Sequence, residues 1–135
     1  MSRFFDTNIL IYAQQDDPRA RIAQELIAEG GTISVQVLNE FTNVLKKKLG
    51  RSWDEVEEAL DDVESILSPV RPLTAVTHAF AVTIARGHRL GFYDALIVAA
   101  AVEAGCDELL TEDLQHGSVI AGITIHNPFR AVSPG

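Results

Sequence analysis

The sequence predicts an α/β fold in which a parallel sheet is covered by helices on both faces. Short apolar stretches typical of strands alternate along the chain with longer stretches of helical periodicity. The first strand, Arg3–Phe5, ends at a lone acid, Asp6, and leads directly into a helix. The most apolar helix, Tyr93–Ala104, has no polar residue between Asp94 and Glu103, so we expect it to be buried on nearly all sides.

Length and composition indicate a single domain covering residues 1–135, with one core. An apolar content of 47% argues against disorder. The single cysteine, Cys106, excludes a disulfide framework. No apolar stretch reaches the roughly 18 residues of a membrane span, and the N-terminus lacks the features of a signal peptide. We therefore expect a cytoplasmic protein.

The net charge of −8 argues at first against a nucleic-acid partner. The charge is unevenly distributed, however, because Trp53–Leu67 holds seven acids and no Lys or Arg. The rest of the chain then has 12 of the 19 acids against 11 basic residues, a net charge of −1. The acidity therefore belongs to one helix and does not describe the functional face.

The first half of the chain continues with a helix, a strand and a second helix. Pro18 opens a helix whose apolar stripe ends at Gly30. Thr32–Val35 has the character of a short strand. The helix that follows ends at Gly50 and has Lys46–Lys48 in its last turns, where positive charge favours the helix dipole.

The remaining elements begin with the acidic helix, for which Ser52 is the expected N-cap. Its apolar stripe consists of Val56, Ala59, Leu60, Val63 and Leu67. Pro69–Pro72 fits an edge strand, because proline cannot donate to a neighbouring strand. Thr74 can cap a helix that runs to about Ala85, followed by a basic loop, Arg86–Gly91. The last strands are expected at Glu108–Thr111 and Ile123–His126.

Four carboxylates stand out from this background: Asp6, Glu40, Asp94 and Asp113. Each has an ordinary structural explanation when taken singly, the aspartates as caps or turn formers and Glu40 as a solvated helix residue. Together they all fall at one rim of the predicted sheet, where ligands gather outside the carboxyl ends of parallel strands.

Four carboxylates at one rim would repel each other strongly unless a cation neutralises them. Hard divalent cations such as Mg²⁺ take oxygen ligands of this kind. Such an ion can turn water into a hydroxide nucleophile and can stabilise the charge on a phosphodiester. The pattern therefore predicts metal-dependent chemistry on a phosphate ester.

Four segments of the chain carry a more specific signal. They are Phe4–Tyr12, Ser34–Phe41, Gly91–Ala101 and Leu110–Leu114. In this order they resemble the four motifs of the PIN-domain family, and most closely those of the small bacterial VapC-type toxins. The resemblance continues to Asn127–Phe129.

This resemblance implies a three-layer α/β/α PIN-like fold with a five-stranded parallel sheet. It also implies a Mg²⁺- or Mn²⁺-dependent endoribonuclease that cleaves RNA phosphodiester bonds with metal-activated water. As the toxin of a type II (VapBC-type) toxin–antitoxin system, such a protein would pair with a small VapB-like antitoxin. We would then expect a homodimer and a toxin–antitoxin hetero-oligomer.

The resemblance also assigns roles to individual residues. The catalytic and metal-binding set is Asp6, Glu40, Asp94 and Asp113, with Asp6 and Asp94 as direct metal ligands. Asn8 matches the polar residue that orients the first aspartate, and Thr111 matches the hydroxyl of the fourth motif. All four acids are present, so the sequence gives no sign of an inactive copy.

The basic loop offers a further candidate site, independent of the resemblance. Arg86, His88 and Arg89 precede Asp94 closely and could contact substrate phosphates. The alternative is an ordinary solvated loop.

Three other functions share part of this pattern. A Mg²⁺-binding receiver-like signalling domain also clusters acids at strand ends, but it needs a lysine from a late strand, and no lysine follows Lys48. A phosphatase that forms an aspartyl-phosphate usually has a second Asp two residues after the first, where this chain has Asn8. The third alternative is a housekeeping PIN nuclease without an antitoxin.

The acidic helix also suggests where an antitoxin would bind. With the helix before it, joined through Gly50–Ser52, it could form a hairpin with an apolar groove edged by acids. A basic amphipathic helix could lie in this groove, and the acids would speed the encounter. The alternative is that the stripe packs on the protein's own core.

Overall fold

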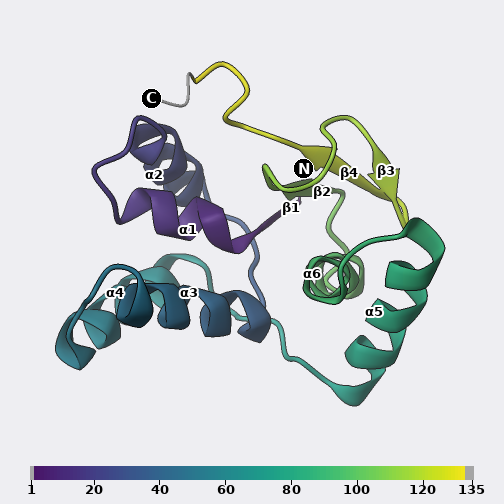
Figure 1. Cartoon of the computed structure of the whole chain (residues 1–135), viewed down its shortest axis with the longest axis horizontal. Coiled ribbons are helices and arrows are strands. Elements are labelled where there is room, and N and C mark those ends of the chain that lie inside the picture. Colours follow the sequence, from purple (N-terminus) through teal and green to yellow (C-terminus); the bar gives the residue numbers. More distant parts are fainter. Residues whose placement is uncertain (1, 133–135) are drawn as a thin grey trace.

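The computed structural model describes residues 2–132. In chain order the elements are β1 (Arg3–Phe5), α1 (Thr7–Ala13), α2 (Ala20–Glu29), α3 (Val35–Lys47), α4 (Trp53–Ile66), α5 (Ala75–His88), α6 (Phe92–Glu103), β2 (Glu108–Leu110), β3 (Val119–Ile120) and β4 (Ile123–His126). The helices form pairs in space, with α1 beside α2, α3 beside α4 and α5 beside α6 (Figure 1). None of the helices in residues 2–132 is both long and apolar enough to span a membrane.

The sheet has four strands in the order β1-β2-β4-β3. The pairs β1–β2 and β2–β4 are parallel, whereas β3 and β4 are antiparallel. The prediction of a five-stranded, wholly parallel sheet is therefore wrong. The reason lies in the two residues between β3 and β4, Ala121 and Gly122, which both have positive φ, of 50° and 83°. A two-residue turn of this kind joins antiparallel strands, because a parallel connection needs a much longer crossover.

Two expected strands reach the sheet through single residue pairs. Thr32 forms a parallel bridge with Phe4, and Arg71 forms one with Ser34. Neither piece extends further, and Ser34 already caps α3 by accepting a hydrogen bond from the backbone N–H of Val37. The extended segment before α3 is thus short and serves only to connect the sheet edge with this helix.

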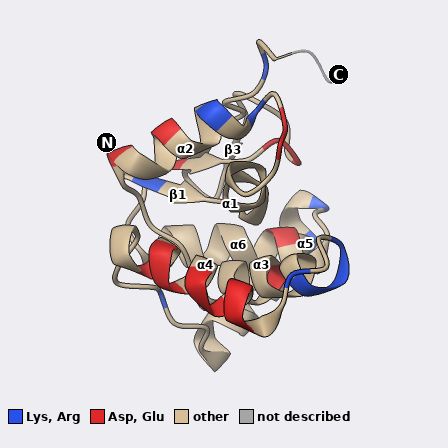
Figure 2. Cartoon of the chain, turned by 90° about the vertical axis from the view of Figure 1, so that its left-hand side faces the viewer, with Lys and Arg blue, Asp and Glu red and all other residues tan. Residues whose placement is uncertain are grey.

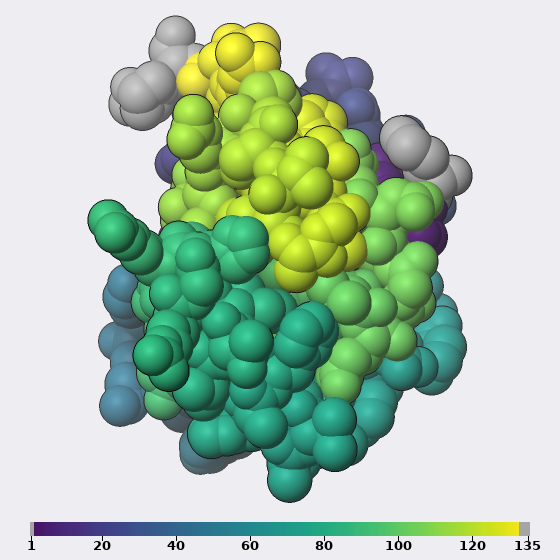
Figure 3. Space-filling view, turned by 90° about the vertical axis from the view of Figure 1, so that its right-hand side faces the viewer, coloured from purple at the N-terminus to yellow at the C-terminus, as the bar shows by residue number. Residues whose placement is uncertain are grey.

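The core runs between the sheet and the helix α6. Every residue from Ala95 to Ala101 is buried, as the uninterrupted apolar run predicts. The alanines in this run let α5 pack closely along α6. Seen from the side of α5, the surface consists largely of this helix and, above it, the C-terminal hairpin (Figure 3).

The helix α5 ends three residues later than predicted. Arg86 and His88 lie in its last turn, and Arg89 ends the helix in the left-handed conformation, with φ 55°. Basic side chains are favourable at this helix end, where they oppose the dipole, and Gly87 does not interrupt the helix. The predicted basic loop is therefore mostly helical.

The acidic helix α4 begins as predicted, with Ser52 and Glu55 forming a capping box. Its acids face outward, which Figure 2 shows as the red bands along α4. The inner stripe is closed off, however, since its members Val56, Ala59, Val63 and Leu67 are buried in the core. This stripe packs on the protein's own core, so it does not offer the groove between α3 and α4 that we expected.

Candidate active site

Asp6 lies where β1 ends and α1 begins. Its backbone N–H donates to the carbonyl of Leu110 at 3.0 Å, which continues the pairing of β1 with β2. One carboxylate oxygen caps α1 by accepting a hydrogen bond of 2.7 Å from the backbone N–H of Thr7. The other accepts a hydrogen bond of 2.7 Å from the hydroxyl of Thr111. Because the residue is only 7% exposed, these bonds hold its side chain in one orientation.

Thr111 joins Asp6 to the segment that follows β2. Its hydroxyl oxygen also accepts a hydrogen bond of 3.1 Å from the backbone N–H of Asp113. The side-chain amide of Asn8 lies 3.4 Å from both carboxylate oxygens of Asp113. The resemblance implied that Asn8 orients Asp6, but in the structure its amide is placed beside Asp113.

Glu40 is brought to the same place by α3. The hydroxyl of Thr7 donates a hydrogen bond of 2.6 Å to its carboxylate, and the glutamate is half-buried. Sequence reasoning missed this role of Thr7. The hydroxyl directly after Asp6 is visible in the sequence, but its partner, 33 positions further on, is set only by the fold.

Asp94 lies in the first turn of α6, three residues after the cap residue Gly91. It is half-buried, and its pKa is raised chiefly by burial. The negative charges of Asp113 and Glu40 act in the same direction. The structure therefore brings all four predicted acids into one cluster, although their catalytic roles stay a prediction.

The cluster also changes the acidity of its two aspartates at the strand ends. Burial, with smaller contributions from the charges of Asp113 and Glu40, raises the pKa of Asp6 from 3.8 to about 7. The hydrogen bonds that Asp6 accepts limit this rise. Burial and the charge of Glu112 raise the pKa of Asp113 as well. Bringing these carboxylates together in their ionised form is thus unfavourable in the protein alone.

The donor set fits a hard divalent cation. All four acids offer oxygen, the ligand that Mg²⁺ and Mn²⁺ prefer, and a cation would neutralise the negative charge that these carboxylates bring together. In the conformation of residues 2–132, no three or more His, Cys, Asp or Glu side chains are arranged to hold an ion. Instead, the hydroxyl of Thr7 donates a hydrogen bond to the carboxylate of Glu40, and the hydroxyl of Thr111 donates one to that of Asp6.

A second polar network adjoins the cluster, and no pattern in the sequence predicts it. The hydroxyl of Tyr12 donates to the carboxylate of Glu112, the neighbour of Asp113. The guanidinium of Arg19 lies 4.0 Å from the centre of the Tyr12 ring and 3.5 Å from Glu112. Asp17 anchors Arg19 at 2.8 Å. These contacts fix the segment that carries Asp113 against the end of α1.

The predicted phosphate-binding residues are not part of the cluster. Arg86, His88 and Arg89 are exposed at the end of α5. Within residues 2–132, no hydrogen bond or ion pair joins them to the four acids. Their proposed contact with substrate stays a prediction.

The raised pKa of Asp6 makes the stability of the metal-free protein depend on pH. The folded protein binds the proton of Asp6 up to about pH 7, whereas the unfolded chain releases it near 3.8. The folded state is therefore favoured at low pH, and this advantage is lost as the pH rises toward 7. We expect wild-type protein in EDTA to lose about 2 kcal/mol more stability between pH 5.5 and pH 8 than Asp6→Asn does. Urea unfolding of both proteins at the two pH values checks this, and equal losses would contradict it.

Comparison with known protein families shows which family has this fold and sequence pattern. Residues 3–119 match the PIN domain. The chain belongs to the PIN-domain family. No curated protein sequence matches the chain significantly.

Solved structures of PIN-domain toxins share this fold. A toxin–antitoxin complex from Klebsiella pneumoniae is 23% identical, with a TM-score of 0.73, over 94% of this chain and 98% of that one. VapBC2 from Rickettsia felis, bound to a DNA fragment from its promoter, is 22% identical, with a TM-score of 0.67 and the same two coverages. VapC20 from Mycobacterium tuberculosis, a toxin that cleaves the sarcin–ricin loop, is 22% identical, with a TM-score of 0.68, over 83% of this chain and 92% of that one. The structural neighbours are thus VapC toxins of toxin–antitoxin complexes.

Proposed function

We propose that this PIN domain is a Mg²⁺- or Mn²⁺-dependent endoribonuclease and the toxin of a VapBC-type toxin–antitoxin pair. The observation that carries the proposal is the gathering of Asp6, Glu40, Asp94 and Asp113 around one buried strand end. PIN domains are a family of nucleases, so membership of this family argues against the receiver-like and phosphatase alternatives.

In this proposal Asp6 and Asp94 hold the ion directly, and Glu40 and Asp113 complete the cluster. When bound, the ion supplies activation of water and neutralisation of charge on the phosphodiester. The chain itself keeps the ligands in place: Thr111 holds one oxygen of Asp6, and the helix end at Thr7 holds the other. This proposal needs no histidine as a general base, because a metal ion held by the acids can itself activate the water.

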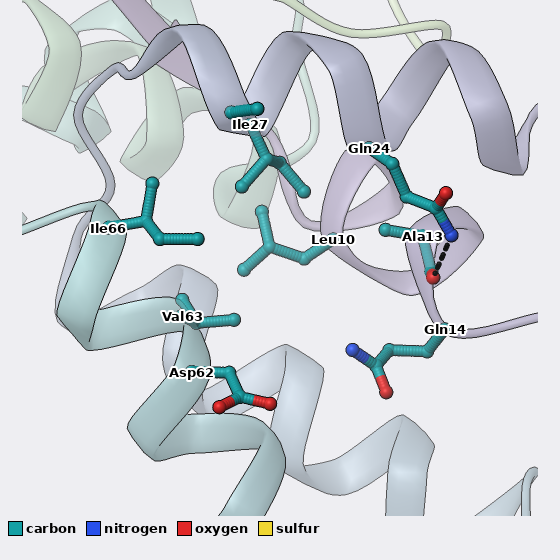
Figure 4. Close-up of a pocket in the computed structure, with 9 residues that line it drawn as sticks. Leu10, Ala13, Gln14, Gln24, Ile27, Asp62, Val63 and Ile66 are labelled. Atoms are coloured by element: carbon teal, nitrogen blue, oxygen red, sulfur yellow. Dashed lines mark hydrogen bonds between the residues drawn. The ribbon is translucent and has the colours of Figure 1, made fainter.

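The antitoxin would bind on the side of α4 that faces α1 and α2, and not between α3 and α4 as the sequence suggested. A hollow of about 230 Å³ opens between α1, α2 and α4 (Figure 4). Its apolar lining comes from Leu10, Ala13, Ile27, Ala28, Val63 and Ile66. Ile66 is 50% exposed although it is apolar, and the acid Asp62 lies at the edge of the hollow. An amphipathic helix with basic residues beside its apolar side matches both features.

Replacing Ile66 by Glu should weaken binding of the antitoxin by at least tenfold, because a charge would be buried under the partner's apolar side. The fold should persist, since this side chain is half exposed. The matched control is Ser65→Glu, which adds the same charge at an exposed position outside the hollow. Binding is measured after coexpression with any small protein that an adjoining reading frame encodes. Equal binding by both variants would place the partner elsewhere, and a lack of any partner would favour a housekeeping nuclease.

A further inference from the structure

Two neighbouring hollows lie on the surface of α3, and the first of them contains Glu40 of the acidic cluster. The first, of about 380 Å³, is lined by Gln36, Asn39, Glu40, Asn43 and Tyr93. The second, of about 520 Å³, is lined by Asn39, Thr42, Asn43, Lys46, Lys47 and Trp53. Asn39 and Asn43 line both, so the two hollows lie side by side along the helix, and we call them together the α3 groove. It begins at Glu40 and Tyr93, the neighbour of Asp94, and so it begins at the candidate active site.

The groove follows one side of a single helix. Its residues Gln36, Asn39, Asn43 and Lys47 recur every three or four positions, which places them on one face of α3. From Glu40 to Lys47 the helix rises by about 10 Å. The groove thus leads away from the acids over a length that spans a few nucleotides.

The two ends of the α3 groove have opposite charge. Lys46, Lys47 and Lys48 are the three lysines of the whole chain, and they lie together at the end of α3. Figure 2 shows this basic segment in blue where α3 leads into α4. In a protein of net charge −8, this is a local concentration of positive charge on an otherwise acidic molecule. It offers contacts to phosphates at a distance from the carboxylates.

The groove also presents two aromatic rings to solvent. Trp53 and Tyr93 are each 62% exposed, although such rings usually bury most of their surface. The ammonium group of Lys46 lies 4.6 Å from the centre of the Trp53 ring and donates to the carbonyl of Arg51. Trp53 is therefore held in place by its neighbour while much of its ring stays open. An exposed, fixed indole beside lysines is a platform on which a base can stack.

From these observations we infer that the α3 groove binds a single-stranded segment of the RNA substrate next to the cleaved bond. Trp53 stacks on a base, Lys47 contacts a phosphate, and Asn39 and Asn43 face the bases between them and the cluster. The inference rests on the proposed ribonuclease function and adds the path of the substrate to it. A basic amphipathic helix, the partner expected of an antitoxin, would suit the groove less well, because Lys46 and Lys47 line its far end and would repel it.

The test measures RNA binding without cleavage, in protein that carries Asp94→Asn. The probe is a fluorescein-labelled single-stranded RNA oligonucleotide, followed by anisotropy at several salt concentrations. Trp53→Ala should weaken binding roughly tenfold, and Trp53→Phe should restore most of it, because stacking needs only an aromatic face. Lys47→Ala should lower the slope of log affinity against log salt by about 0.7, as the loss of one phosphate contact predicts. Lys48→Ala is the matched control, because this exposed lysine does not line the groove.

A second readout is direct, because Trp53 is the single tryptophan of the chain. Its fluorescence should be quenched when RNA binds, whether or not the protein cleaves. Unchanged fluorescence together with unchanged binding by Trp53→Ala would overturn the inference and leave the nuclease proposal intact. Loss of antitoxin binding in Trp53→Ala, with RNA binding unaffected, would overturn it in favour of a protein interface. If wild-type protein neither binds nor cleaves RNA, the proposed function fails along with the inference.

Discussion

Replacing Asp6 by Asn is expected to reduce RNA cleavage by ~10²–10³-fold, the usual effect of removing a group that acts on charge in the transition state. The substitution removes the charge and keeps the shape. The amide oxygen of Asn can still accept from the backbone of Thr7, and its NH₂ group can donate to the hydroxyl of Thr111. The loss of activity should therefore not come from a loss of fold.

The measurement is cleavage of a labelled RNA hairpin in the presence of Mg²⁺ or Mn²⁺, with EDTA as a second way to abolish it. The matched control is Asp61→Asn, which removes one exposed carboxylate from α4, away from the cluster. This control should cleave like wild type. If Asp6→Asn cleaves at the wild-type rate, either the nuclease activity belongs to a contaminant or the site lies elsewhere on the protein.

Replacing Asp94 by Asn should weaken the affinity for Mn²⁺ by at least ~10–100-fold. This is the usual loss when a metal site loses a hydrogen-bond partner of one of its ligands. A direct ligand contributes more than such a partner does. Asp94 also stabilises little else, because its side chain forms no hydrogen bond within residues 2–132, so the variant should fold normally. The metal should accordingly stabilise wild type much more than the variant.

Calorimetric titration with Mn²⁺ gives the affinity, and thermal unfolding with and without the ion gives the linked stability. At an ion concentration of 100 times its Kd, wild type should gain about 2.7 kcal/mol, and the variant should gain much less. Asp61→Asn again serves as the control for removal of a carboxylate. Equal affinity for Mn²⁺ in wild type and Asp94→Asn would reduce Asp94 to an ordinary residue of the first helical turn.

The parts of the fold that follow from local pattern could be predicted from the sequence. The buried helix α6 follows from an apolar run, and the start of α4 follows from a Ser-x-x-Glu capping box. The clustering of the four acids also followed, because parallel strands and early helical turns bring their ends to one rim. For the two helices one short stretch of chain contains the whole cause, and for the acids the alternation of strands and helices supplies it.

The sheet could not be predicted in the same way. The antiparallel strand β3 is only two residues long, and its signal is the positive φ of Ala121, which the residue type does not favour. The site also contains contacts between distant parts of the chain, such as Thr7 with Glu40 and Tyr12 with Glu112. Such pairs become visible only when the fold sets the distance between them.

The C-terminal end of α5 also could not be predicted from the sequence. The basic residues Arg86 and His88 can belong equally to a loop or to the last turn of a helix. The left-handed conformation of Arg89 decides between these, and sequence pattern does not reveal it. Likewise, the apolar Val76 near the start of α5 is 71% exposed, whereas the polar Thr77 beside it is buried and donates a hydrogen bond to Glu103.

The burial of α6 has a consequence for how the protein loses function on heating. With Ala95–Ala101 shielded on all sides, the backbone N–H groups of this helix can exchange with solvent only when the whole domain opens. Asp94 stands on the first turn of that helix, so no partial opening can carry it away from the strand ends. Hydrogen exchange in α6 should therefore be among the slowest in the chain. Metal binding should persist up to the unfolding temperature and disappear together with the fold.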